Sequence, residues 1–354
     1  MRRWLSQIGI NIAVVTFGLL LAFAVAEVAV RLLITDSGYY TSYEPADAGR
    51  WTTHPFLPFA GQPSADLTLF TAGKAEHIRT NAYGFRAHEF PATKAPQDYF
   101  VLCFGGSTTY GYRTGSNDKT WPERLEQMLA ARYPERNVRV FNMGMDLGTT
   151  ATSLVNLMTV GVHVQPDLVI VYHGFNDLSS LGYRKHRTDY SHYYADLPSQ
   201  VWRGVQASVP QWMLVSRAVH DLTGALDMWM GVNDLARAVM NPRDDDPDRM
   251  KGIETVLRNL RTMHDVARGA GAEILFSTFQ FTRGDEGLYG TFNQALRGFF
   301  DRHGYRWVDQ ARLLPDNDPS INVDECHFTQ KGRDLMAQGF YDYIVAADLV
   351  DRAL

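Results

Sequence analysis

The feature that most constrains the fold is the regular alternation of short apolar runs with amphipathic stretches from residue 98 onward. Five runs have the length and composition of buried strands, at 99–104, 138–143, 168–172, 274–279 and 305–308. Stretches with helical periodicity lie between and after them, at about 121–129, 150–164, 253–267, 292–302 and from 329 onward. This alternation predicts an α/β fold: a doubly wound, mostly parallel five-stranded sheet between two layers of helices. Ligands bind such sheets at the carboxyl ends of the strands, so we expect the chemistry in the loops there.

Charge and cysteine content exclude several classes of protein. The 354 residues include 34 Lys and Arg against 39 Asp and Glu, with a formal net charge of -5. A nucleic-acid binder normally carries a basic surface, so no nucleic-acid partner is expected. Cys103 and Cys326 are the two cysteines, which excludes a disulfide scaffold and a four-cysteine zinc site.

The N-terminus predicts export. Residues 8–26 are uncharged and follow Arg2 and Arg3. A helix over this stretch, at about 1.5 Å per residue, nearly matches a bilayer core of about 30 Å. Because positive charge stays in the cytoplasm, residues 1–34 are predicted as a signal anchor in the inner membrane, with membrane contact through residues 8–34 and the remainder on the periplasmic side. The alternative is a signal peptide cleaved near Ala26, after an A-x-A site, which would give a secreted protein.

Three further segments are predicted. Residues 35–97 are rich in Tyr, Thr, Pro, Gly and Ala, and are expected to form a juxtamembrane linker with short strands and loops. Residues 98–354 form the main domain. It contains an insert at 179–249, which is too long for a bare connection and is interpreted as a helical cap over the site. The insert is rich in Tyr and Trp, which either line the site or pack the insert against the sheet.

The first candidate catalytic residue is Ser107, in the segment 104–111 (Phe-Gly-Gly-Ser-Thr-Thr-Tyr-Gly). It follows the first buried strand directly, and two glycines before it allow a sharp turn. This places the hydroxyl at the carboxyl edge of the sheet. The same residues also occur in ordinary turns.

A serine nucleophile needs a base, and the base needs an acid to orient it. Asp324 and His327 lie three residues apart just before the last helix, so one turn places both side chains on the same side. The carboxylate can then hold the imidazole while the other ring nitrogen reaches Ser107. A surface loop before a capped helix is the alternative interpretation.

An acyl-transfer site also needs donors for the developing oxyanion. Two segments that end strands are candidates, 142–148 and 174–177. The second offers the side-chain amide of Asn176, and the first offers a backbone N–H near Gly148. His173 is a candidate for lining the pocket. No metal site is expected at His173, His327 and Asp324, because their spacing is not typical of metal ligands.

Together these motifs resemble the SGNH/GDSL hydrolases over roughly residues 98–352. The family pattern is a serine after the first strand, a glycine after the second, G-x-N-D after the third and D-x-x-H before the last helix. The resemblance implies a flavodoxin-like three-layer fold. It implies that Ser107 is the nucleophile and gives its own N–H to the oxyanion hole with Gly148 and Asn176. It also implies that His327 is the base, that Asp324 orients it, and that no cofactor is needed.

The sequence departs from the family pattern at two motifs. The first motif has Gly-Gly-Ser-Thr instead of Gly-Asp-Ser, and resembles a membrane-anchored bacterial subgroup. The family glycine usually stands five residues after Asn142, where this chain has Leu147, with Gly148 one residue later. Either backbone amide is therefore a candidate donor. A second G-x-N-D at 231–234 lies in the insert and is interpreted as a coincidence.

The sequence thus predicts an exported serine esterase whose substrate is an ester on a carbohydrate, such as acetyl groups on a surface polysaccharide. An O-acetyltransferase on the same substrates, or a lysophospholipase or thioesterase acting on a lipid or thioester, would use the same residues. A catalytically silent module that binds a polysaccharide or protein is the alternative of another class.

Overall fold

The computed structural model describes residues 2–33, 49–52, 54–71, 74–182, 186–195, 250 and 252–351. Its centre is a parallel five-stranded sheet with the strand order β6-β5-β7-β8-β9. The strands are β5 (Asp98–Gly105), β6 (Asn137–Asn142), β7 (Leu168–Tyr172), β8 (Glu273–Ser277) and β9 (Arg306–Val308). The predicted five-stranded parallel α/β sheet is confirmed, with each strand close to its expected range.

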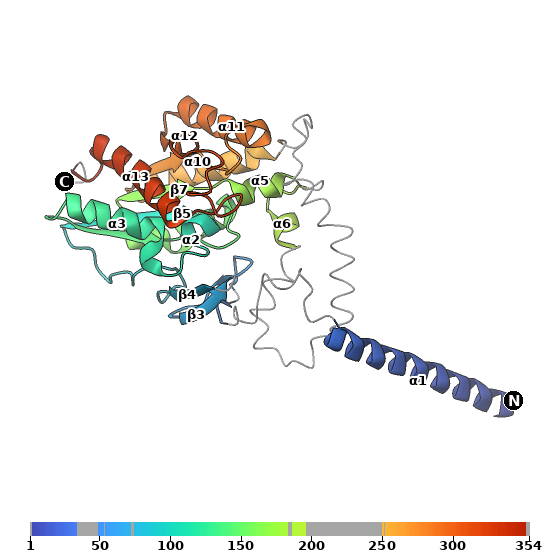
Figure 1. Ribbon diagram of the computed structural model, residues 1–354. Coiled ribbons are helices and arrows are strands. Elements are labelled where there is room, and N and C mark those ends of the chain that lie inside the picture. Colours follow the sequence, from blue (N-terminus) through green and yellow to red (C-terminus); the bar gives the residue numbers. More distant parts are fainter. Residues whose placement is uncertain are drawn as a thin grey trace.

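Helices cover both faces of this sheet (Figure 1). The main ones are α3 (Trp121–Arg132), α4 (Thr150–Thr159), α10 (Ile253–Gly269), α11 (Gly287–His303) and α13 (Gln330–Ala346). Helices α3 and α13 pack together on one face, and α4 and α10 pack together on the other. All five residues of β7 are buried, as expected for a parallel strand covered on both sides.

The strand order places a topological switch point between β5 and β7. From β5 the chain runs to β6 on one side, then returns to β7 on the other side of β5. Loops that leave two neighbouring strands in opposite directions open a crevice at their carboxyl ends. Ser107 follows β5 and Asn176 follows β7, so both candidate residues stand at this crevice.

The region before the sheet packs onto the loops of the crevice. Short strands pair antiparallel there, β1 (Trp51–Thr52) with β2 (Ala60–Gly61) and β3 (Asp66–Thr71) with β4 (Lys74–Arg79). Their apolar side chains form a second buried cluster with Tyr110, from the turn after Ser107, and Met145, from the loop after β6. Arg86 is buried and donates to Glu76 (2.9 Å) and to the Gly111 carbonyl (2.7 Å). The described part of residues 35–97 therefore supports the site loops directly.

Two details of the helices follow from local contacts. Helix α3 begins at Trp121, as expected. Thr120 and Glu123 have the spacing of a capping box, but none forms. The Thr120 hydroxyl donates to the Asn117 carbonyl instead (2.9 Å), and Glu123 faces His88. In α13 the buried face includes Met336 and Phe340, and Leu335 is 38% exposed.

Most of the insert lies outside the described residues. Residues 183–185, 196–249 and 251 are not described, so the predicted helical cap, the tryptophans and the second G-x-N-D at 231–234 fall outside. Two parts of the insert are described. Residues 179–182 include the end of α5 (Phe175–Leu181), and residues 186–195 contain α6 (Ser191–Ala195). Tyr190 and Tyr193 are buried there, which fits the interpretation that these aromatics pack the insert onto the domain.

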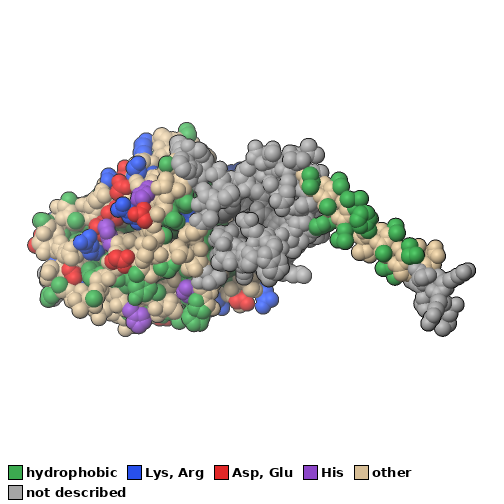
Figure 2. All heavy atoms as spheres, turned by 90° about the horizontal axis from the view of Figure 1, so that it is seen from below, with side chains coloured by type: hydrophobic (Ala, Val, Ile, Leu, Met, Phe, Trp, Pro, Cys, Tyr) green, Lys and Arg blue, Asp and Glu red, His purple; other side chains and the backbone are tan. Residues whose placement is uncertain are grey.

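The N-terminal segment is one helix, α1 (Arg2–Leu33). All described side chains from 9 to 25 are exposed, and the space-filling view shows them as a run of hydrophobic atoms along the helix (Figure 2). Within the residues that the structure describes, no helix combines the length and the apolar character needed to span a membrane.

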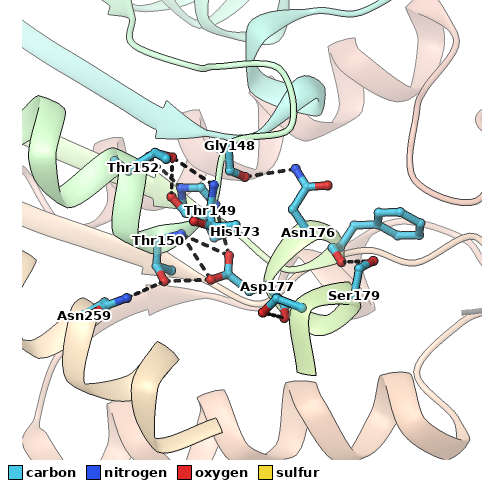
Figure 3. Close-up of polar contacts among 12 residues, drawn as sticks. Gly148, Thr149, Thr150, Thr152, His173, Asn176, Asp177, Ser179 and Asn259 are labelled. Carbon is cyan, nitrogen blue, oxygen red and sulfur yellow. Dashed lines mark hydrogen bonds and ion pairs between the residues drawn. The ribbon is translucent and has the colours of Figure 1, made fainter. Parts of the chain in front are cut away.

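The buried carboxylate of Asp177 joins the loop after β7 to the start of α4 (Figure 3). Asp177 is 0% exposed. It accepts hydrogen bonds from the Thr150 N–H (3.1 Å to each oxygen), the Thr150 hydroxyl (2.7 Å) and the Tyr190 hydroxyl (2.8 Å). The Thr150 amide is the first of α4 and has no acceptor inside the helix, so the carboxylate both satisfies it and complements the helix dipole.

His173 extends the same network. Its Nδ1 lies 3.4 Å from the Asp177 carboxylate, and its Nε2 lies 2.7 Å from the Ser153 hydroxyl on α4. Both partners are buried. His173, a candidate for lining the pocket, therefore lies in a packed polar cluster that holds the turn after β7 against α4.

We predict that Asp177→Ala lowers the free energy of unfolding by about 2–4 kcal/mol. The substitution leaves the Thr150 N–H, the Thr150 hydroxyl and the Tyr190 hydroxyl buried without this acceptor. The measurement is the urea midpoint of the full-length protein followed by fluorescence. Asp265→Ala, at an exposed carboxylate of α10, should change stability by less than about 0.5 kcal/mol. Equal midpoints for the two variants would contradict the assigned role of Asp177.

Candidate active site

Three residues far apart in sequence form a hydrogen-bonded chain at the carboxyl edge of the sheet. Ser107, the first residue of α2 (Ser107–Tyr110), has its Oγ 2.8 Å from Nε2 of His327. The other ring nitrogen of His327, Nδ1, lies 2.9 Å from both carboxylate oxygens of Asp324. This is the geometry in which a histidine removes a serine proton while a carboxylate holds its tautomer.

Close backbone approaches explain the glycines before Ser107. A Cβ on Gly105 would lie 2.0 Å from Oγ1 of Thr109 and 2.6 Å from the carbonyl of Tyr172. A Cβ on Gly106 would lie 2.8 Å from Nδ2 of Asn176. Only glycine lets the chain turn from β5 into α2 this close to β7 and its loop.

The loop before α13 holds Asp324 and His327 through its own backbone. One Asp324 oxygen accepts the N–H groups of Cys326 (3.1 Å) and His327 (2.9 Å), which closes a tight turn. Thr282 donates to the Asp324 carbonyl, and Thr108 donates to the Cys326 carbonyl (3.1 Å). The last contact ties the loop directly to the residue after Ser107.

This environment shifts the pKa of both partners. Burial acts to raise the pKa of Asp324, but hydrogen bonds from the His327 ring and the two backbone amides lower it far more, so the carboxyl is ionised at neutral pH. Burial acts to lower the pKa of His327, whereas the neighbouring Asp324 carboxylate raises it above its usual value. Burial also raises the pKa of Cys326, so its thiol is neutral near pH 7 and the Asp324 carboxylate carries the upward shift of His327.

Two residues after the Ser107 motif also stand beside this chain of contacts. The Tyr112 ring centroid lies 5.1 Å from that of His327, and the Arg113 guanidinium lies 3.8 Å from the Asp324 carboxylate. Sequence reasoning did not identify them, since their contact with the D-x-x-H loop depends on the left-handed backbone of Gly111 and Arg113.

The candidate oxyanion donors lie close to Ser107, and each already donates a hydrogen bond to a different acceptor. Nδ2 of Asn176 donates to the Gly148 carbonyl (2.9 Å), as Figure 3 shows. The Gly148 amide donates to the Met145 carbonyl (2.9 Å), and the Leu147 amide donates to the Asp146 carboxylate (3.0 Å). In this structure both backbone amides of the second motif therefore have acceptors, and Gly148 meets Asn176 through its carbonyl.

The backbone at Leu147 shows where the family glycine would stand. Leu147 has a φ of 56°, the left-handed region that favours glycine. A Cβ on Gly148 would instead meet the Met145 carbonyl at 2.7 Å. The backbone at 147 favours glycine because of its φ, and the position at 148 favours glycine because a Cβ there would clash. The chain has glycine only at 148.

Two clusters among the described residues bring potential metal ligands together. One is Asp324, Cys326 and His327, whose polar atoms already serve the hydrogen bonds described above. The other is His88 with two residues of α3, Glu123 (3.4 Å) and Glu126 (3.3 Å). The carboxylates raise the pKa of His88 to about 10, so this cluster is an ion pair with a protonated histidine.

Comparisons with known proteins give one family match and several similar solved structures. Residues 103–209 match the model of the GDSL-like lipase/acylhydrolase family. No curated protein matches the chain. Similar solved structures include a putative acylhydrolase from Bacteroides fragilis, with 14% identity, a TM-score of 0.43 and coverage of 73% of this chain and 92% of that one. Another is the acetylxylan esterase Axe2 from Geobacillus stearothermophilus, with 15% identity, a TM-score of 0.44 and coverage of 70% and 94%.

The matched segment contains the Ser107 motif, the loop after β6 and the G-x-N-D turn after β7, which together form the crevice at the switch point. Residues 103–209 are therefore similar to a GDSL-like lipase/acylhydrolase domain, a similarity that supports an enzyme acting on ester bonds.

Proposed function

We propose that the chain is a serine esterase in which Ser107 is the nucleophile, His327 the base and Asp324 the residue that orients the base. The observation that carries the proposal is the continuous contact from Ser107 Oγ to His327 Nε2 (2.8 Å) and from His327 Nδ1 to Asp324 (2.9 Å). A serine hydroxyl is a weak nucleophile at neutral pH and gains reactivity when a neutral imidazole accepts its proton.

In the proposed reaction, Ser107 Oγ attacks the ester carbonyl carbon as its proton passes to His327. The tetrahedral oxyanion accepts hydrogen bonds from the Ser107 N–H, which as the first of α2 has no intrahelical acceptor, and from the second N–H of Asn176 Nδ2. The intermediate collapses, and the leaving alcohol takes the proton from His327. Water then attacks the acyl-enzyme by the same route, which releases the acid and restores Ser107.

For the substrate we propose an acetylated carbohydrate. Ser107 is only 8% exposed, which favours a small acyl group over a long lipid chain. Two of the three described tyrosines of the insert, Tyr190 and Tyr193, are buried and hydrogen-bonded to the site loops, so they do not offer faces for a sugar. The half-exposed ring of Tyr112 beside His327 is a described aromatic surface that a sugar could meet.

The direct test is intact mass spectrometry of the full-length protein after a fluorophosphonate probe. We expect a single adduct in the unsubstituted protein and none in Ser107→Ala, because the phosphorus traps an activated serine hydroxyl. Ser153→Ala is the matched control. Ser153 also contacts a histidine (2.7 Å) but is buried in the packed cluster, so its loss should leave the adduct in place.

Hydrolysis assays then separate the substrates. Release of acetate from acetylated oligosaccharides, with none from a lysophospholipid, is the expected pattern. Faster transfer of the acetyl group to an added sugar than to water would identify a transferase. An adduct that persists in Ser107→Ala, or folded protein that forms none, would overturn the serine mechanism and leave the binding module.

The raised pKa of His327 predicts the pH dependence. The base works as neutral imidazole, so kcat/KM should fall as pH decreases through a pKa above the usual 6.5. In Asp324→Asn the imidazolium loses its stabilising carboxylate. The pKa should then fall, the acid limb should move to lower pH, and the plateau should drop by a factor on the order of 10²–10⁴.

Cys326→Ala separates the two neighbours of the imidazole. Because the thiol is neutral near pH 7, its removal should leave the acid limb where it was. A downward shift in Cys326→Ala as large as that in Asp324→Asn would show that the sulfur, and not the carboxylate, sets the pKa of the base.

We further propose that α1 anchors the enzyme on the outer side of the inner membrane. The support is its composition, uncharged from 8 to 26 after Arg2 and Arg3, and the exposure of the described side chains. Those side chains, from 9 to 25, cover about 26 Å of helix against about 30 Å for a bilayer core, so the flanking residues decide whether the helix spans.

Cell fractionation of a bacterium that expresses the full-length chain with a C-terminal tag tests the location. We expect the tag in the membrane fraction after a carbonate wash, digestion of the tag by protease added to spheroplasts, and an intact N-terminus. A mature chain that starts after Ala26 in the soluble periplasmic fraction would support the secreted alternative. A tag that is protected in spheroplasts would exclude both.

A further inference from the structure

We propose that Tyr193, on α6 of the insert, is a positioning residue for the oxyanion hole: its hydroxyl holds the amide of Asn176 in the orientation that leaves one N–H free for the substrate. The Tyr193 hydroxyl donates to Oδ1 of Asn176 at 3.2 Å. Tyr193 is 4% exposed. The inference rests on the proposed function, because it gives Tyr193 a role only if Asn176 stabilises the oxyanion.

The two neighbours of Asn176 determine which way its amide points. The carbonyl of Gly148 can only accept a hydrogen bond, so the atom 2.9 Å from it must be the NH₂ group. The Tyr193 hydroxyl then meets the amide oxygen and donates to it. The flipped amide would set two carbonyl oxygens against each other at the Gly148 end.

This arrangement accounts for each polar atom of the amide. One N–H of Nδ2 goes to Gly148, and Oδ1 accepts from Tyr193. The remaining N–H of Nδ2 is the one available to an oxyanion. The NH₂ group also lies beside Gly106, at the position where a Cβ on that glycine would be 2.8 Å away, and Gly106 precedes Ser107 directly.

The neighbours of Tyr193 on the same segment contact different groups. The hydroxyl of Tyr190 donates to Asp177, and that of Tyr194 lies 2.9 Å from Oγ1 of Thr149. Among these three tyrosines, Tyr193 is the one whose hydroxyl donates to the Asn176 side chain. The start of the insert thus touches both loops of the crevice, with one tyrosine placed at a donor of the oxyanion hole.

Fixing the amide matters because catalysis depends on donors that are already aligned when charge develops. A single oxyanion donor contributes on the order of 10²–10³ in kcat. Without Tyr193 the amide keeps only its bond to Gly148 and can rotate about its side-chain torsions. We therefore expect Tyr193→Phe to lower kcat about tenfold, less than the complete loss of the amide in Asn176→Ala.

The test is a double-mutant cycle of Tyr193→Phe and Asn176→Ala in the full-length enzyme, measured on a p-nitrophenyl acetate substrate. If Tyr193 acts through Asn176, Tyr193→Phe lowers kcat about tenfold in the unsubstituted enzyme and has no further effect in Asn176→Ala. KM and the acid limb of the pH profile should stay unchanged, because neither the base nor its carboxylate is touched.

Tyr194→Phe is the matched control. It removes a hydroxyl from the same helix, but one that contacts Thr149 (2.9 Å) and the Leu147 carbonyl (3.4 Å) and not the Asn176 side chain. Any loss of kcat should therefore be equal with and without Asn176. A loss in Tyr193→Phe that is also equal in both backgrounds would mean that the hydroxyl supports α6 generally, and would overturn the proposal. No loss of kcat would overturn it as well.

The outcomes also separate this inference from the proposed function. If Asn176→Ala itself leaves kcat unchanged, Asn176 is not an oxyanion donor and the assignment of the hole fails. If Ser107→Ala keeps full activity, the serine mechanism fails. The double-mutant cycle tests the role of Tyr193 only if Asn176→Ala and Ser107→Ala both lower kcat.

Discussion

Strand β5 pairs with β7 in a parallel register that sets Gly105 opposite Tyr172. Two residues beyond each of these positions the chain reaches Ser107 on one side and Gly174 on the other. Ser107 and the G-x-N-D turn therefore leave the sheet at the same level and in opposite directions. A slip of this register would separate Asn176 from Ser107 whatever the loops did, so this strand pairing is the constraint on which the site depends.

The loops that leave these strands are held by polar contacts in addition to apolar packing. A fully buried carboxylate is costly unless its acceptors are used, and Asp177 meets that condition with the first amide and hydroxyl of α4 and with Tyr190. Few arrangements of these side chains keep every hydrogen bond, because each buried polar group needs its partner. This fixes the turn after β7 relative to α4, and with it the backbone that carries Asn176.

Much of this arrangement was predictable from sequence, because it depends on local patterns. Apolar runs predicted the five strands, and the D-x-x-H spacing predicted that Asp324 and His327 would share a turn. The position of Tyr193 was not predictable, since its contact with Asn176 joins an insert to a loop seventeen residues away with no periodic signal. At the start of α3 the Thr120 hydroxyl donates to the Asn117 carbonyl, and its side chain does not cap the helix. His173 was a candidate for lining the pocket. Its two ring nitrogens instead contact Ser153 and Asp177 in the packed cluster.

The second motif shows how a departure from a family pattern is accommodated. Leu147 occupies the left-handed backbone region that glycine favours, at a cost of order 1 kcal/mol. Its amide and that of Gly148 both have acceptors within the loop. The contribution of this loop is therefore an acceptor, the Gly148 carbonyl, which together with the Tyr193 hydroxyl sets the direction of the Asn176 amide. In this chain the loop after β6 thus supplies the acceptor, the Gly148 carbonyl, that faces the amide supplied by the loop after β7.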